Sequence, residues 1–226
     1  MDEIKPKIKA IIFDMDGTII NTERAWQKTT IEVIKTYCTI AEFTEEQKKF
    51  LRTLSGVGLA HSVAAIKEFF NLPQPIDEIM AYKTKVAAKN LSTDISFIEG
   101  FEQFHKRLQA AAIPTSVATN ASPETLQQMS QKMNLRDFFG HNLYCSADVG
   151  HKFKPDPAVF LHAAQKLLVK PEDCIVFEDS LAGIQAAKAA GMKCIAIKNE
   201  FNQNFLDQAH NAIESYHQAD EVLKKI

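Results

Sequence analysis

Two short apolar runs, far apart in the chain, each lead into a pair of acidic residues. The first run, at 8–13, is followed by Asp14-Met15-Asp16-Gly17-Thr18, and the second ends in Glu178-Asp179. Apolar runs of this length are typical of buried strands. Two carboxylates spaced two residues apart at a strand end point to the same side, and like charges so close repel each other. Because parallel strands place their carboxyl ends at one edge of a sheet, the pattern predicts a Mg2+ site at that edge.

Strand-like and helical patterns alternate over most of the chain. Further strand-like runs lie at 115–119, 143–146, 174–178 and 193–197. Helical patterns lie at 100–111, 123–133, 156–168 and 181–190, and a last helix is expected near 218–225. Ser122 before Pro123 is typical of a helix start, and Gly191 is typical of a helix end. This alternation favours an α/β fold with a doubly wound parallel sheet.

The block from 21 to 93 breaks the alternation, because it contains only helical patterns. Residues recur at helical spacing from Trp26 to Tyr37, from Leu59 to Phe70 and from Ile76 to Ala87. Strand patterns resume after the block, which is therefore expected to be an insert rather than a domain at one end of the chain. The sequence predicts one α/β unit, 1–20 and 94–226, interrupted by an all-helical unit, 21–93.

Composition excludes several classes of partner. The 226 residues carry a net charge of −2, which gives no basic footprint for nucleic acid. We expect no membrane association, since no apolar run has the length of a membrane span, and no signal peptide at 1–7. The four cysteines form no Cys-x-x-Cys motif. We therefore predict reduced, buried thiols and a cytoplasmic location.

Four motifs resemble, in the same order, those of the haloacid dehalogenase superfamily of phosphotransferases. They are Asp14 to Thr18, Thr119, Lys154, and the pair Glu178-Asp179. The resemblance covers nearly the whole chain and implies a Rossmann-like core. The helical insert looks like the cap of the superfamily's β-phosphoglucomutase-like branch. Connections near 19–22 and 92–97 would then be hinges that let the cap close over the site and exclude water.

The first motif provides two candidate catalytic residues. Asp14 is the predicted nucleophile, because a carboxylate can form an aspartyl-phosphate and split hydrolysis into two steps. Asp16 is the predicted general acid and base, although it would otherwise be a solvated turn residue. A free aspartate has a pKa of about 3.9, so the acid role requires surroundings that raise it. Mg2+ would be held by Asp14, Glu178 and Asp179 and, by the resemblance, by the backbone carbonyl of Asp16. The alternative for Glu178-Asp179 is a pair of acids that complements a helix N-terminus.

The other two motifs provide candidate phosphate ligands. Thr119 is expected to bind the transferring phosphate, with Asn120 beside it and a helix N-terminus nearby. The alternative is that both residues only cap that helix. Lys154 is expected to neutralise the charge of the phosphate and of Asp14. Lys152 is its rival, but the Lys-Pro-Asp-Pro context favours Lys154.

The insert is expected to select the substrate. Glu23 and Trp26 are candidate substrate-binding residues, although Trp26 could equally belong to the core of the cap. Trp26 and Leu59 stand where β-phosphoglucomutases carry a histidine and an arginine, and a mutase needs that arginine to hold a second phosphate. We therefore predict a Mg2+-dependent, monomeric phosphatase that acts on a small phosphorylated metabolite, such as a sugar or polyol phosphate. The alternatives are a phosphohexomutase of the β-phosphoglucomutase type and a non-catalytic protein that binds a phosphorylated metabolite.

Overall fold

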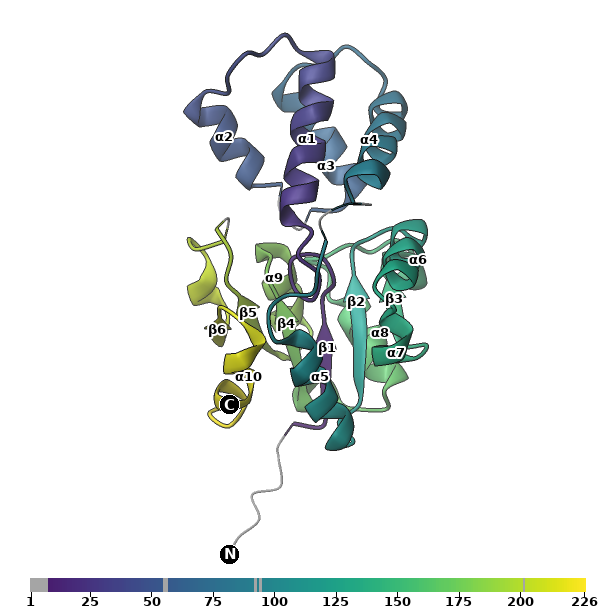
Figure 1. Ribbon diagram of the computed structural model, residues 1–226, viewed down its shortest axis with the longest axis vertical. Helices are drawn as coiled ribbons and strands as arrows, with labels where there is room; N and C mark the ends of the chain where they lie inside the picture. Colours follow the sequence, from purple (N-terminus) through teal and green to yellow (C-terminus); the bar gives the residue numbers. More distant parts are fainter. Residues whose placement is uncertain (1–7, 55–56, 92, 94, 201) are drawn as a thin grey trace, which may run out of the picture.

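A parallel sheet forms the centre of the α/β unit in the computed structural model (Figure 1), which describes residues 8–54, 57–91, 93, 95–200 and 202–226. Within these residues the sheet has six strands in the order β3-β2-β1-β4-β5-β6. Their bounds are Ala10–Phe13 (β1), Thr115–Thr119 (β2), Leu143–Cys145 (β3), Cys174–Glu178 (β4), Lys193–Ile197 (β5) and Asn211–Ile213 (β6). The observed sheet confirms the predicted doubly wound α/β fold.

Helices cover both faces of the sheet, and the side chains of β1 alternate between the two cores that these helices form with it. Ile11 and Phe13 belong to the core beneath α5, α6, α7 and α10, and Ile12 belongs to the core beneath α8 and α9. The ring of Phe13 stacks on Phe177 of the neighbouring strand, with 5.3 Å between ring centroids. The helix bounds are Phe101–Ala110 (α5), Pro123–Lys132 (α6), Leu135–Phe139 (α7), Ala158–Lys166 (α8), Leu181–Ala189 (α9) and Ala219–Leu223 (α10).

Two local signals in the sequence mark helix ends as predicted. The hydroxyl of Ser122 accepts a hydrogen bond from the backbone N–H of Thr125 at 3.2 Å and so caps α6. Gly191 follows α9 with a φ of 73°, a left-handed conformation that favours glycine. The sequence did not indicate α7 or β6, which are only five and three residues long. Elements this short show no recognisable period.

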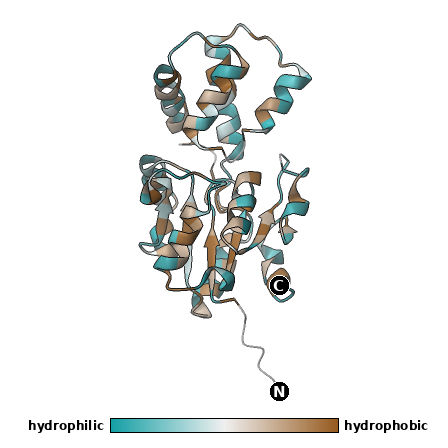
Figure 2. Ribbon diagram, turned by 180° about the vertical axis from the view of Figure 1, so that it is seen from behind, coloured by the Kyte–Doolittle hydropathy of each residue, from teal (hydrophilic) through white to brown (hydrophobic). Residues whose placement is uncertain are grey.

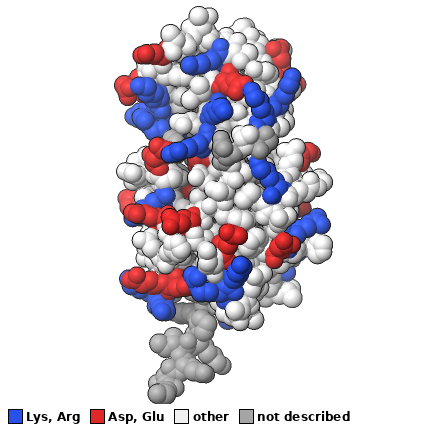
Figure 3. Space-filling view, in the orientation of Figure 1, with Lys and Arg blue, Asp and Glu red and all other residues white. Residues whose placement is uncertain are grey.

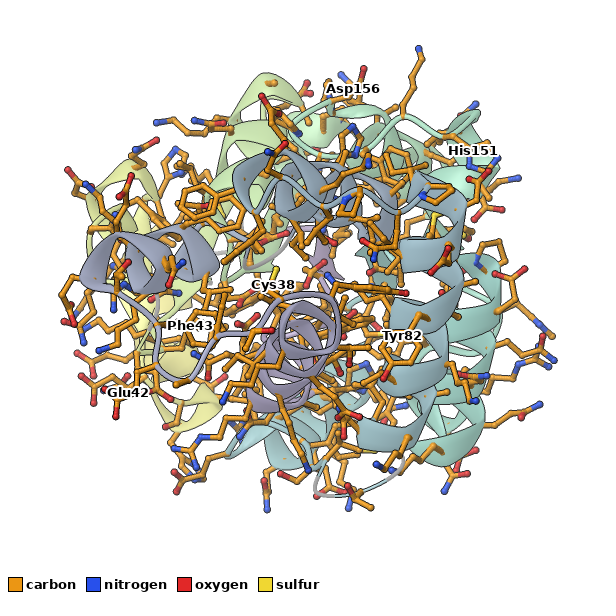
Figure 4. The ribbon with its side chains drawn as sticks, turned by 90° about the horizontal axis from the view of Figure 1, so that it is seen from above. Cys38, Glu42, Phe43, Tyr82, His151 and Asp156 are labelled. Atoms are coloured by element: carbon orange, nitrogen blue, oxygen red, sulfur yellow. The ribbon has the colours of Figure 1, made fainter. Side chains whose placement is uncertain are left out.

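Four helices form a separate layer above the carboxyl edge of the sheet (Figure 1). They are α1 (Glu23–Tyr37), α2 (Glu45–Arg52), α3 (Leu59–Phe69) and α4 (Ile76–Asn90). The predicted helical stretches correspond to α1, α3 and α4, whose buried residues form a core of their own. Figure 2 shows hydrophobic segments alternating with hydrophilic ones along these helices. Seen from above, Phe43 and Tyr82 lie on opposite sides of α1 (Figure 4), and the rings of Tyr37 and Tyr82 are 5.8 Å apart.

The two connections between the layers run side by side. The backbone N–H of Asn21 donates to the carbonyl of Ser96 at 2.9 Å, and the N–H of Ile98 donates to the carbonyl of Ile19 at 3.0 Å. The expected second hinge, 92–97, includes residues 92 and 94, which lie outside the described residues. The paired connections bring the start of α1 next to the loop that follows β1.

Several predictions from composition can be compared with the structure. All four cysteines are free thiols, as predicted, and three of them are buried. Among the described helices, none combines the length and the apolar character that crossing a membrane requires. Acidic and basic side chains are interspersed over the face drawn in Figure 3, without a large region of one sign.

Candidate active site

A pocket lies between the carboxyl edge of the sheet and the helical layer. Both layers contribute to its lining, which includes the loop after β1, the end of β2 and the loop before α8 from the α/β unit, and α1, α2, α3 and α4 from the helical layer. Seven of the nine predicted site residues line this pocket: Asp14, Asp16, Glu23, Trp26, Thr119, Asn120 and Lys154. The other two, Glu178 and Asp179, lie directly beside Asp14.

Asp14, Glu178 and Asp179 form a buried cluster of carboxylates. Each offers an oxygen that lies within 4.8 Å of the others. The register of the sheet explains this meeting, because Phe13 of β1 pairs with Phe177 of β4 and the acids follow immediately. The expected meeting of two distant acidic motifs at one sheet edge is therefore observed.

Lys154 lies among these carboxylates. Its Nζ donates to Asp14 Oδ1 at 2.5 Å and to Glu178 Oε1 at 2.8 Å, and the side chain is buried. The side-chain oxygen of Asn120 accepts the backbone N–H of Lys154 at 2.9 Å and so holds the loop in place. Lys152 is exposed, so of the two lysines Lys154 is the one beside the carboxylates. Burial by itself lowers the pKa of Lys154, but Asp14 and Glu178 outweigh it and keep the pKa above its ordinary value.

The cluster carries more negative charge than the lysine can offset. Burial raises the pKa of Asp14 to about 8, although Lys154 opposes the change, and Glu178 adds to it. Burial also raises the pKa of Asp179 well above its ordinary value, with further contributions from Glu23 and Glu178. A hard divalent cation with oxygen ligands would offset this charge, so the residues present fit Mg2+.

The carboxylates of the cluster differ in the number of hydrogen bonds that they accept from protein donors. Glu178 Oε2 accepts hydrogen bonds from the N–H groups of Asp179 and Ser180 and from the Ser180 hydroxyl, at 2.7 to 2.9 Å. Its Oε1 accepts from Lys154. Asp179 instead accepts one bond on each oxygen, from Thr18 at 3.3 Å and from a second donor, the Asn199 amide, at 3.1 Å. Since a carboxylate oxygen has two lone pairs, Asp179 retains acceptor capacity that Glu178 Oε2 lacks.

Asp16 faces the start of α1. Its Oδ1 accepts from the hydroxyl of Thr22 at 2.8 Å and from Nε1 of Trp26 at 3.0 Å. Burial raises the pKa of Asp16, and the bonds from Trp26 and Thr22 oppose that change. Trp26 packs against the core of the α/β unit rather than the core of the helical layer, which answers the alternative of a cap-core residue.

Thr119, at the end of β2, is buried, and its hydroxyl accepts the backbone N–H of Ala121 at 3.0 Å. Thr119 and Asn120 both line the pocket just before the N-terminus of α6. Each side chain therefore accepts a backbone N–H while it lines the pocket, Thr119 from Ala121 and Asn120 from Lys154. The sequence left helix capping as the alternative to phosphate binding, but the residue that caps α6 is Ser122 rather than Thr119 or Asn120.

Sequence reasoning missed several residues around the site. Thr22 was not singled out, although its spacing of four from Trp26 places both on one face of α1. Lys83 and Ser62 line the pocket from the helical layer, where helical spacing indicated only that Lys83 lies on the buried face of α4. The hydroxyl of Tyr216 donates to the carbonyl of Thr18 at 3.1 Å and so ties the C-terminal segment to the first acidic loop. That segment showed no motif.

Comparisons with known proteins agree with the motifs. The sequence profile described as haloacid dehalogenase-like hydrolase matches residues 11–197. The chain is 28% identical over 192 residues to the 6-phosphogluconate phosphatase of Escherichia coli, covering 83% of this chain and 81% of that protein. It is 26% identical over 226 residues to the bifunctional riboflavin kinase/FMN phosphatase of Arabidopsis thaliana, of which it spans 55%.

One crystal structure extends the comparison to the fold. The β-phosphoglucomutase of Clostridium difficile superposes with a TM-score of 0.74 at 22% identity, covering 96% of this chain and 98% of that chain. Likeness at this level of identity shows a shared fold. The family resemblance predicted from four short motifs is therefore confirmed by independent comparisons over most of the chain.

Proposed function

Because the chain belongs to the haloacid dehalogenase-like hydrolase family, we propose that it is a Mg2+-dependent phosphatase of a small phosphate monoester, such as a sugar or polyol phosphate. The reaction would pass through an aspartyl-phosphate. The observation that carries the proposal is the placement of Asp14, 2.5 Å from Lys154, in a carboxylate cluster at the base of a pocket. Residues 1–20 and 94–226 would form the catalytic core, and 21–93 the cap, of a cytoplasmic monomer.

In the first step, an oxygen of Asp14 attacks the phosphorus atom of the ester. The new bond joins Asp14 to phosphorus, and the bond from phosphorus to the leaving oxygen breaks. Lys154 offsets the negative charge on Asp14 and on the phosphate, and Thr119 and Asn120 line the position where the phosphate would be held. The buried setting of these groups strengthens each electrostatic interaction.

Asp16 would move the protons of both steps. Protonated Asp16 gives its proton to the leaving alkoxide, and the resulting carboxylate then takes a proton from the water that attacks the aspartyl-phosphate. This second attack breaks the bond between phosphorus and Asp14, so it releases phosphate and restores the enzyme. Burial supports the acid role because it raises the pKa of Asp16. The bonds from Thr22 and Trp26 orient the carboxyl group.

Asp14, Glu178 and Asp179 would hold Mg2+, together with the backbone carbonyl of Asp16. When bound, Mg2+ offsets the repulsion between the carboxylates and the incoming phosphate and so makes attack of one anion on another feasible. Hydrogen bonds from Thr18 and Asn199 to Asp179, and from Ser180 to Glu178, support this arrangement because they fix the orientations of the two carboxylates.

One position of the pocket supports hydrolysis over a mutase reaction. Leu59 lines the pocket where β-phosphoglucomutases carry an arginine, so the cations that line the helical side of the pocket are Arg52 and Lys83, and neither stands at that position. The relative named 6-phosphogluconate phosphatase supports a small phosphorylated metabolite as substrate. If the mutase alternative held, β-glucose 1-phosphate would be converted to glucose 6-phosphate without net phosphate release.

The test is phosphate release from p-nitrophenyl phosphate and a panel of sugar and polyol phosphates, with Mg2+ and with EDTA. We expect release that requires Mg2+ and is abolished in Asp14→Asn. The matched control is Asp207→Asn, since Asp207 is an exposed aspartate outside the pocket. Full activity of Asp14→Asn would refute the assigned nucleophile, and phosphate binding without turnover by the unaltered protein would favour the binding-protein alternative.

A further inference from the structure

Tyr216 is a fully buried tyrosine of the C-terminal segment, on a short helical turn at Tyr216–Gln218 between β6 and α10. Its hydroxyl donates to the backbone carbonyl of Thr18 at 3.1 Å. Its ring packs among four phenylalanine rings of the α/β core, with 5.3 to 6.0 Å between ring centroids: Phe13, Phe101, Phe104 and Phe177. A phenylalanine would fill the same space, so packing alone does not require the hydroxyl.

The carbonyl that accepts this bond belongs to the loop that carries Asp14 and Asp16. Thr18 is completely buried, and among the described residues no backbone N–H donates to its carbonyl. Because an unpaired buried carbonyl is destabilising, the Tyr216 hydroxyl stabilises this position of the loop. Burial raises the pKa of Tyr216 well above its ordinary value, and Asp14 and Asp179 add to that change, so the hydroxyl stays protonated and able to donate.

The other side of the same loop contacts Asp179. The hydroxyl of Thr18 donates to Asp179 Oδ1 at 3.3 Å. Gly17 packs so closely on this carboxylate that a Cβ at Gly17 would overlap it. Thr18 is therefore bonded to Tyr216 through its carbonyl and to Asp179 through its hydroxyl. A displacement of the Thr18 backbone would move a donor to Asp179 and the surface on which Asp179 packs.

The turn that carries Tyr216 is anchored independently of the loop. The backbone N–H of Tyr216 donates to the carbonyl of Glu99 at 2.9 Å. Gly100 lies directly before α5 and against His217, since a Cβ at Gly100 would come within 2.9 Å of the backbone nitrogen of His217. These contacts fix Tyr216 to the start of α5, so its hydroxyl holds the loop from a position that the α/β core sets.

We propose that Tyr216 is a positioning residue for the acidic site, whose hydroxyl fixes Thr18 and, through Thr18, the orientation of Asp179 in the carboxylate cluster that would hold Mg2+. The inference rests on the proposed function and deepens it, because it assigns a role in the site to the C-terminal segment. Tyr216 is not among the residues that line the pocket, so we expect no direct effect on binding of the ester. Loss of a group that orients a metal ligand typically weakens metal affinity by about 10–100-fold. Because Tyr216 acts through one intervening residue, we expect about tenfold, the lower end of that range.

The test is Tyr216→Phe, which removes the hydroxyl and keeps the ring in its cluster. Calorimetric titration with Mg2+ in the absence of ester should give a Kd about tenfold above that of the wild type. The half-saturating Mg2+ concentration for hydrolysis of p-nitrophenyl phosphate should rise by the same factor. At saturating Mg2+, KM for the ester should stay within about twofold of the wild-type value, a split that loss of folded protein would not produce.

The matched control is Tyr144→Phe. The hydroxyl of Tyr144 donates to Asn142 Oδ1 at 3.0 Å, and neither residue lines the pocket. This variant also loses one tyrosine hydroxyl and one hydrogen bond, so it controls for the substitution itself. Its Mg2+ affinity should equal that of the wild type.

A double-mutant cycle tests the route through Thr18. Thr18→Val removes the donor to Asp179 and keeps the carbonyl that accepts from Tyr216. If Tyr216 acts through Thr18, the loss of Mg2+ affinity in the double variant should be smaller than the product of the two single losses. Losses that multiply would overturn the assigned route. Thr18→Val decides the question if Tyr216→Phe does not fold, because weaker Mg2+ binding would support the route and unchanged binding would overturn it.

The outcomes separate this inference from the proposed function. Mg2+-dependent hydrolysis by the wild type, combined with unchanged Mg2+ affinity in Tyr216→Phe, would overturn the positioning role alone. Absence of hydrolysis of every ester would count against the phosphatase, and the Mg2+ titrations would still decide the role of Tyr216. If the wild type bound no Mg2+, hydrogen exchange of peptides covering residues 14–20 would decide it. Faster exchange confined to these residues in Tyr216→Phe would support the role, and exchange equal to that of the wild type would overturn it.

Discussion

Replacing Lys83 with methionine is expected to stabilise the protein without ligand. The substitution removes a buried ammonium that, among the residues described by the structure, has one neutral acceptor and no counter-charge. Methionine has a similar length and is apolar, and its flexible side chain fills irregular space well.

The size of the effect follows from the pKa. Burial lowers the pKa of Lys83 from its ordinary value of 10.5 to about 8. This difference corresponds to about 3 kcal/mol for keeping the side chain protonated in the folded protein near neutral pH. The hydroxyl of Ser62 loses its donor in the variant, which costs about 1 kcal/mol. The net expectation is a gain of about 2 kcal/mol, or about 4–8 °C in Tm for a chain of this size.

The sign of the pH dependence provides an independent check. Between the folded pKa of about 8 and the ordinary value of 10.5, the unfolded chain binds more protons at Lys83 than the folded chain does. The wild type therefore gains stability from this residue as the pH rises through that window, and the advantage of Lys83→Met should shrink. Comparing variants at each pH cancels the titration of the other lysines and the tyrosines.

The assay is urea unfolding of the wild type, Lys83→Met and Lys85→Met at several pH values from neutral to alkaline. Lys85→Met should match the wild type throughout, because Lys85 is exposed. A Lys83→Met protein that is less stable than the wild type near neutral pH would refute the reasoning, since the ammonium must then have a compensating partner. An advantage that is constant with pH would refute the assigned titration.

Three further predictions concern the rest of the molecule. Trp26→Phe removes a donor to the carboxyl group of Asp16, so kcat for p-nitrophenyl phosphate should fall about tenfold in steady-state kinetics, and an unchanged kcat would show that the indole does not position Asp16. Gly183→Ala would place a Cβ against Glu178 Oε1, so both the urea midpoint and Mg2+-dependent turnover should fall, and a variant that keeps both would contradict the crowding at this contact. Burial lowers the pKa of His105 from 6.5 to about 4, so the unfolded chain binds more protons in that window and the free energy of unfolding should decrease as the pH falls through it. The slope should flatten in His105→Phe, and an identical slope in that variant would show that His105 is not its source.

The sequence allowed the sheet edge and its carboxylates to be predicted, because those features depend on local patterns. The acidic motifs end strands, and neighbouring parallel strands must bring their ends together, as β1 and β4 do. The donors to Asp16 and the isolated position of Lys83 depend instead on how the helical layer sits on the sheet. No local pattern encodes that docking. For Lys83, helical spacing indicated burial but not the absence of a counter-charge, which requires knowledge of every neighbour.

The helical layer does more than cover the site, because it contributes side chains to the pocket and a hydrogen bond to a proposed catalytic residue. Through Trp26 it donates a hydrogen bond to the carboxyl group that would protonate the leaving oxygen. Through Lys83 it places a buried cation in the lining of the pocket. A movement of the layer away from the sheet would break the first contact and withdraw the second together. A substrate bound between the two layers would therefore favour the docked position of α1 and α4, and with it the arrangement in which Trp26 holds Asp16. Substrate recognition and proton transfer would then be linked through one rigid set of helices.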